Sequence, residues 1–101
     1  MTDEQVFELV RGELAKARTR YPFWPADLVH AAAIANEEMS EVIKSVNNRF
    51  WGHGDDTWAD IQGEAVQAIA MLVRFLTESQ DIDPYELTHN LVIQQEAAHG
   101  R

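Results

Sequence analysis

The sequence predicts an all-α protein: a helical bundle of about four helices, with two long central antiparallel helices. Apolar residues recur at the three- and four-residue spacing of amphipathic helices. Short joints that contain proline or glycine separate these periodic stretches, and no stretch shows the alternation of a β-strand. With 101 residues, 46% of them hydrophobic, the chain is expected to form one domain, 1–101, with a core of its own.

The first helix is expected over residues 3–18, where Thr2 and Gln5 have the spacing of a capping box. The aromatic and proline-rich joint that follows cannot continue a helix. Pro25 suits the first position of a second helix, which is expected over residues 25–48.

A loop with two glycines then leads to the third helix. Thr57 and Asp60 are spaced as its cap, and its apolar repeat continues to about Glu78. Asp83, followed by a proline and by Glu86, predicts the start of a fourth helix.

Composition excludes several classes of function. The chain has no cysteine, so disulfides and thiolate metal sites are excluded. A net charge of −9 argues against a binding surface for a nucleic acid polymer, which would need clustered Lys and Arg. No apolar run approaches the length that spans a bilayer, and the acidic N-terminus is unlike a signal peptide. We expect a cytoplasmic protein without a membrane partner.

Both long helices carry carboxylates beside apolar stripes. Glu38 and Glu41 are three residues apart, and so are Glu64 and Gln67, so that each pair shares one helix face. Between residues 65 and 76 the only polar side chains are Gln67 and Arg74, which predicts that the third helix is largely buried. A carboxylate on such a helix is costly unless it is paired or holds a cation.

Antiparallel packing of the two long helices would bring these two pairs face to face. Three carboxylates and an amide oxygen would then converge on one point, which is an environment suited to Mg²⁺ or Mn²⁺. The simpler interpretation is that the glutamates form a solvated face and that Asp60 only caps its helix.

The motif residues are similar to those of a known family. Glu-Glu-Met-Ser-Glu at 37–41, followed by Glu-Ala-Val-Gln at 64–67, resembles the EExxE…ExxD signature of the MazG-like all-α NTP pyrophosphohydrolases, and more closely a small branch that reads ExxQ. The resemblance covers roughly residues 21 to 79. It implies a homodimer that uses Mg²⁺ to cleave a nucleoside triphosphate substrate between its α and β phosphates, giving a monophosphate and pyrophosphate.

Carried over by position, the resemblance implies that Glu38, Glu41 and Glu64 are metal ligands, with Gln67 where the family usually has Asp. Glu38 and Glu41 become the candidate catalytic residues, because the metal they hold helps to activate a water nucleophile. Glu37 is a further metal-site candidate. Asp60, one turn before Glu64, is a candidate for the charge that Gln67 does not supply.

Four residues are candidates for substrate binding. Lys44, near Glu41, would meet a phosphate or form a surface ion pair. Asn48 and Trp51, at the end of the second helix, would bind a base or simply stop the helix. Arg74 lies in an apolar context and is expected to pair with a carboxylate of the metal site or with a phosphate.

Two other interpretations remain open. The missing charge at Gln67 favours a catalytically weak or inactive helical dimer that binds a nucleotide or a protein partner. Glu-x-x-His occurs at 86–89 and at 96–99, as in di-iron carboxylate proteins. That chemistry needs the motif on two different helices, whereas both copies here lie on the last one.

Overall fold

The fold is all-helical, as the sequence predicts. The computed structural model describes residues 1–52, 54–86, 93 and 95. Within these ranges the chain forms helices α1 (Asp3–Arg20), α2 (Leu28–Phe50) and α3 (Trp58–Glu78), and no β-strand. Residues 84–86 are also helical, at the expected start of a fourth helix. The second Glu-x-x-His motif, and the histidine of the first, lie outside the described residues. None of the helices in the described ranges is long and apolar enough to cross a membrane.

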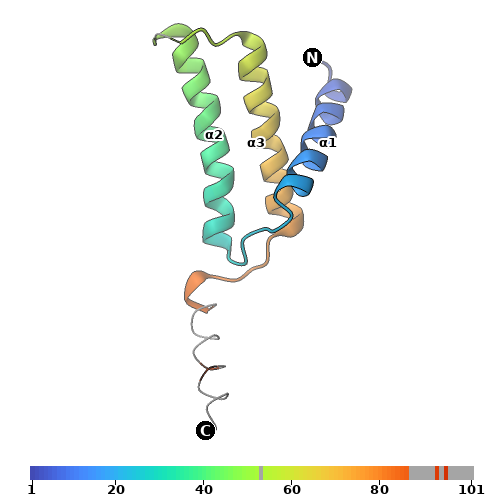
Figure 1. The fold of residues 1–101 in the computed structure, drawn as a ribbon, viewed down its shortest axis with the longest axis vertical. Coiled ribbons are helices and arrows are strands. Elements are labelled where there is room, and N and C mark those ends of the chain that lie inside the picture. The colour runs from blue at the N-terminus through green and yellow to red at the C-terminus, as the bar shows by residue number, and fades with distance from the viewer. Residues whose placement is uncertain (53, 87–92, 94, 96–101) are drawn as a thin grey trace.

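Helix α3 lies between the other two long helices (Figure 1). Helix α2 packs against it in the antiparallel direction across the loop at 51–57, which confirms the expected antiparallel pair. Helix α1 packs on the other side of α3 and runs in the same direction as α3 (Figure 1). In the described part of the chain α1 contacts α2 only weakly, so α3 alone is central.

The local signals for the helix starts are confirmed in three cases. Thr2 and Gln5 form a complete capping box at α1, and Thr57 and Asp60 form another at α3. Asp83 caps the turn that starts at residue 84, because its carboxylate accepts a 2.6 Å hydrogen bond from the N–H of the third residue after it. Each cap satisfies backbone donors at the first turn of its helix.

The predicted start of α2 at Pro25 is wrong. The N-cap is Asp27, whose carboxylate accepts a 2.9 Å hydrogen bond from the N–H of His30 and also contacts the His30 ring. A start at Pro25 would have made Trp24 the cap, and an indole cannot accept a hydrogen bond from the first turn. Trp24 instead donates to the Ser79 hydroxyl at 2.8 Å, which attaches the joint to the end of α3.

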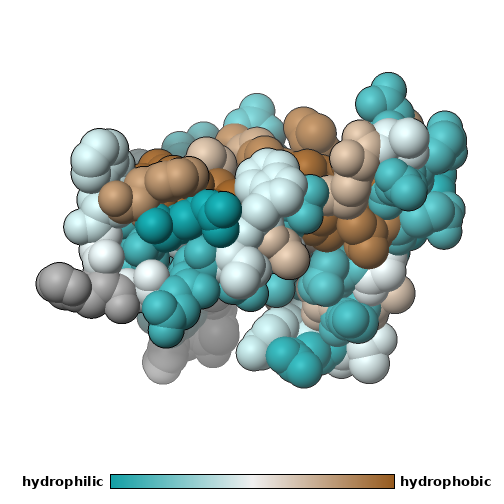
Figure 2. Space-filling view, turned by 90° about the horizontal axis from the view of Figure 1, so that it is seen from above, coloured by the Kyte–Doolittle hydropathy of each residue, from teal (hydrophilic) through white to brown (hydrophobic). Residues whose placement is uncertain are grey.

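The core is small and lies mainly between α1 and α3. Val10 and Leu14 of α1 pack against Val66 and Ala70 of α3. The expectation that α3 is largely buried is wrong for a single chain, because only two of its sides are covered. Its exposed residues include Gln67, Ile69, Leu72 and Leu76. Figure 2 shows hydrophobic side chains gathered in patches on the surface.

Candidate metal centre and substrate cleft

Glu38 of α2 and several neighbouring glutamates form one electrostatic group. Glu38 is half-buried, and burial raises its pKa above the ordinary 4.5. Neighbouring negative charges raise this pKa further, in decreasing order Glu64, Glu41, Glu37 and Glu13. We call these five residues the acidic cluster. The structure thus brings together four of the candidate residues, and it adds Glu13 of α1, which the sequence did not reveal.

The negative charge of this cluster is largely uncompensated. Within the described residues, the carboxylates of Glu37, Glu38, Glu41 and Glu64 form no ion pair and no hydrogen bond. Glu13 alone has a cationic partner, Lys16, at 3.7 Å. A bound cation stabilises such a group of carboxylates, because it relieves the repulsion between them.

The cluster fits a divalent cation in its chemistry rather than in its spacing. Carboxylate and amide oxygens are the ligands that Mg²⁺ and Mn²⁺ prefer. However, no three Asp, Glu or His side chains in the described part of the chain are arranged to hold a metal ion. The expected convergence on one point is therefore not formed, and the carboxylates would have to move towards one another to share an ion.

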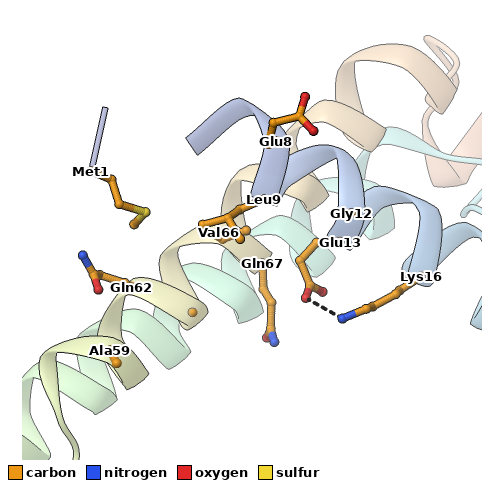
Figure 3. A pocket seen from close by; sticks show the side chains of 11 residues that line it. Met1, Glu8, Leu9, Gly12, Glu13, Lys16, Ala59, Gln62, Val66 and Gln67 are labelled. Carbon is orange, nitrogen blue, oxygen red and sulfur yellow. Dashed lines mark ion pairs between the residues drawn. The ribbon is translucent and has the colours of Figure 1, made fainter. Parts of the chain in front are cut away.

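Gln67 is exposed and lies next to the cluster. It lines a cleft together with Glu37 and Glu38. It also lines a second hollow, of about 390 Å³, between the first halves of α1 and α3. Figure 3 shows its side chain extending from α3 on the side where Glu13 and Lys16 pair. This position is compatible with a neutral oxygen ligand at the edge of the cluster.

The interpretation of Asp60 as a metal ligand needs correction. Its carboxylate accepts hydrogen bonds from the Thr57 N–H at 2.8 Å and from the Thr57 hydroxyl at 3.0 Å. These bonds, the backbone one first, lower the pKa of Asp60. Asp60 is also absent from the charges that raise the pKa of Glu38. Its carboxylate therefore serves the cap of α3.

The partner expected for Arg74 is also corrected. Its side chain is only 2% exposed, and its Nε and Nη2 donate to the two carboxylate oxygens of Glu78, both at 2.9 Å. Arg18 donates to the same carboxylate at 3.1 Å, and the Arg74 guanidinium lies 4.9 Å from the centre of the Trp24 ring. Arg74 thus holds three parts of the fold together, and its fork is not free for a phosphate. The spacing of Arg74 and Glu78, one helical turn, is a signal present in the sequence.

The other substrate candidates lie apart from the cleft. Lys44 is exposed and has no ion pair within the described residues. Trp51 is 85% exposed at the end of α2, so it is not packed. Asn48 is half-buried beneath the loop, where a Cβ on Gly54 would come within 2.8 Å of the Asn48 Cβ. Position 54 therefore has to be a glycine, and Asn48 supports the loop.

A cleft of about 940 Å³ lies between the three helices and the joint before α2. Glu37, Glu38 and Gln67 line it from α2 and α3. Helix α1 contributes two cations, Lys16 and Arg20, which the sequence did not single out. Their spacing with Glu13 places all three on one stripe of α1, but only the packing of α1 against α3 turns that stripe towards the acids.

No protein-family model, no curated protein and no solved structure matches the chain. The resemblance to the MazG-like group therefore rests on the motif residues, and function has to be argued from the acidic cluster and the cleft.

Proposed function

We propose that the chain is a metal-dependent nucleoside triphosphate pyrophosphohydrolase, which converts an NTP or dNTP into a monophosphate and pyrophosphate. The observation that carries the proposal is the acidic cluster. Glu41 on α2 and Glu64 on α3 each lie near enough to Glu38 to raise its pKa, and no cationic side chain in the described residues pairs with these three carboxylates. The order of these residues along the chain is that of the MazG-like motif.

Each residue has a role in this proposal. Glu38, Glu41 and Glu64 would hold Mg²⁺ or Mn²⁺, with Gln67 as a neutral ligand and Glu37 beside them. The bound ion would draw charge from the phosphates and lower the pKa of an attacking water. The half-buried position of Glu38 would weaken the screening of this interaction by bulk water. A water oxygen would bond to the α or the β phosphorus as the bond from that phosphorus to the bridging oxygen breaks. The bridging oxygen would leave on the other phosphate, and the proton of the water would pass to a nearby carboxylate or to solvent.

The proposal includes a homodimer. Apolar side chains of α2 and α3 are exposed in the single chain although they follow helical spacing: Val29, Met39, Ile43, Ile69, Leu72 and Leu76. A second copy would cover such stripes, because a twofold interface places the same surface of each chain against the other.

The test is a screen of nucleoside triphosphates with Mg²⁺, in which released pyrophosphate is measured. We expect the wild type to release pyrophosphate and to melt at a higher temperature with Mg²⁺, since a ligand of the folded state stabilises it. Glu41→Gln should lose the activity and keep the fold, as checked by circular dichroism. Asp81→Asn, which removes an exposed carboxylate after α3, is the matched control and should keep both properties.

Two outcomes would count against the proposal. Large unfolding of Glu41→Gln would show that Glu41 supports the fold rather than the reaction. A wild type that neither releases pyrophosphate nor responds to Mg²⁺ or Mn²⁺ in its melting temperature would refute the metal site.

The second candidate is a catalytically weak or inactive helical dimer that binds a nucleotide or a protein. Two observations favour it: Gln67 brings no negative charge, and the carboxylates in the described residues form no ready coordination shell. Binding of a nucleoside triphosphate without any release of pyrophosphate would establish this second candidate in place of the enzyme.

A further inference from the structure

We propose that the cleft binds a nucleotide lengthwise, with its phosphates at the acidic cluster and its base against Phe23 and Tyr21. This inference rests on the proposed function for the class of substrate, and it assigns recognition to residues of α1 and of the joint before α2. None of them belongs to the acidic motif.

The directions of the helices give the cleft two different ends. Helices α1 and α3 run in the same direction and α2 runs in the opposite direction (Figure 1). Glu13, Glu38 and Gln67 therefore lie towards one end of the cleft, which we call the acidic end. Arg20 lies seven residues further along α1, roughly 10 Å away at the rise of a helix. The joint that follows Arg20 forms the other end, which we call the aromatic end.

The aromatic end presents two rings that are exposed in the described part of the chain. Phe23 is 90% exposed and Tyr21 is 64% exposed, although both line the cleft. Trp24 holds the joint in place, because its indole N–H donates to Ser79 at 2.8 Å and its ring lies against the Arg74 guanidinium. A ring that is held by an anchored backbone and open on its face is suited to stack against a flat base.

Two cations lie between the ends. Lys16 and Arg20 are one turn apart on α1, and both are exposed and line the cleft. Lys16 already pairs with Glu13, whereas Arg20 has no ion pair among the described residues. An arginine with a free fork is suited to phosphate oxygens. Along the cleft, the acidic cluster is therefore followed by the two cations and then by the two aromatic rings. In a bound nucleotide, metal-bound phosphates would lie at the acidic cluster, a further phosphate at the cations and the base at the rings.

The test uses full-length protein and probes that resist the proposed reaction. Titration calorimetry with Mg²⁺ would compare α,β-methylene nucleoside triphosphates of the four common bases with inorganic triphosphate, which lacks the nucleoside. We expect Phe23→Ala to weaken binding of the tightest nucleotide analogue by about tenfold, and to leave inorganic triphosphate unchanged. Phe23→Trp should retain the affinity. Phe7→Ala, which removes an exposed ring of α1 outside the cleft, is the matched control.

Arg20 is tested with the same probes. Arg20→Ala should weaken the nucleotide analogue and inorganic triphosphate to a similar extent, because it removes a phosphate contact, and Arg20→Lys should restore part of the affinity. Equal binding by wild type and Phe23→Ala, or no binding of any analogue by wild type, would overturn the inference.

The failure of this inference is distinguishable from failure of the proposed hydrolysis. If the protein releases pyrophosphate and Phe23→Ala binds the nucleotide analogue with unchanged affinity, the proposed hydrolysis is supported. The aromatic end is then refuted as the base site. Base-dependent binding that Phe23→Ala abolishes would support the aromatic end as the base site. If the natural triphosphates then released no pyrophosphate, the proposed hydrolysis alone would be refuted.

Discussion

Within the acidic cluster, the repulsion between carboxylates acts on the ionisation of Glu38. Burial and the charges of Glu64, Glu41, Glu37 and Glu13 raise its pKa, so the folded state disfavours the ionised form. Its contribution to stability is therefore fully present below the ordinary value of 4.5 and is lost as the pH rises through the higher pKa of the folded state.

We expect Glu38→Gln to raise the melting temperature of the metal-free protein at neutral pH, because it removes this repulsion. The pH dependence of stability above 4.5 should also become flatter. Thermal unfolding from acidic to neutral pH in the presence of a chelator measures both effects. Asp81→Asn is again the control. A lower melting temperature in Glu38→Gln would mean that this carboxylate makes a stabilising contact and carries no net repulsion.

Gln67 decides how much charge the site has. Gln67→Asp should tighten Mg²⁺ binding by on the order of tenfold, because a charged oxygen ligand replaces a neutral one. It should also raise the pKa of Glu38 further, since Gln67 lines the same cleft. Calorimetric titration of both forms with Mg²⁺ gives the comparison. Binding restored only by the substitution would favour the inactive dimer, and no binding in either form would contradict the metal site.

The elements are joined by an ion-pair cluster at the end of α3. Arg74 is buried and bonds both oxygens of Glu78, to which Arg18 of α1 also donates. Trp24 lies over the Arg74 guanidinium, so the cluster connects α1, α3 and the joint before α2. The positions of α1 and of the aromatic end relative to the acids depend on these contacts.

Glu78→Ala should therefore be strongly destabilising. It would leave the Arg74 guanidinium buried without its carboxylate, at a cost of about 3 kcal/mol or more. Arg18→Ala removes a half-exposed partner of the same carboxylate and should cost less than about 1 kcal/mol. Urea unfolding of the two variants measures the difference. Similar small losses in both would show that Arg74 does not depend on Glu78.

At the scale of the whole molecule, an apolar stripe on the central helix α3 stays exposed in the single chain. Leu72 is 50% exposed and Leu76 is 80% exposed on the central helix. An apolar stripe of this kind on a small protein is typical of an interaction surface.

We expect the wild type to have twice the 11.5 kDa mass of one chain in sedimentation equilibrium. Leu72→Glu should produce monomers, because it places a charge in the apolar stripe. Ala15→Glu adds the same charge at an exposed position of α1 and should leave the dimer intact. A monomeric wild type, or equal masses for wild type and Leu72→Glu, would refute this interface.

What the sequence determines here is local. The capping boxes at Thr2 and Thr57 and the cap at Asp83 follow from the residues themselves, because each is completed within three residues of the cap. Helical spacing and one antiparallel turn also suffice to predict that Glu41 and Glu64 lie near Glu38, but not how far their carboxylates stay from a common point. The sequence also contains the signal for the true start of α2, because Asp27 is a better N-cap residue than Trp24.

Only the tertiary structure decides which face of each helix is covered and what lies opposite it. The apolar repeat of α3 includes both Val66 and Leu72, yet α1 covers the first, whereas the second stays 50% exposed. Lys16 and Arg20 read as ordinary surface cations until the packing of α1 on α3 turns them towards the acids. Periodicity records only that a face is apolar or charged, whereas its partner depends on contacts between residues far apart in the chain.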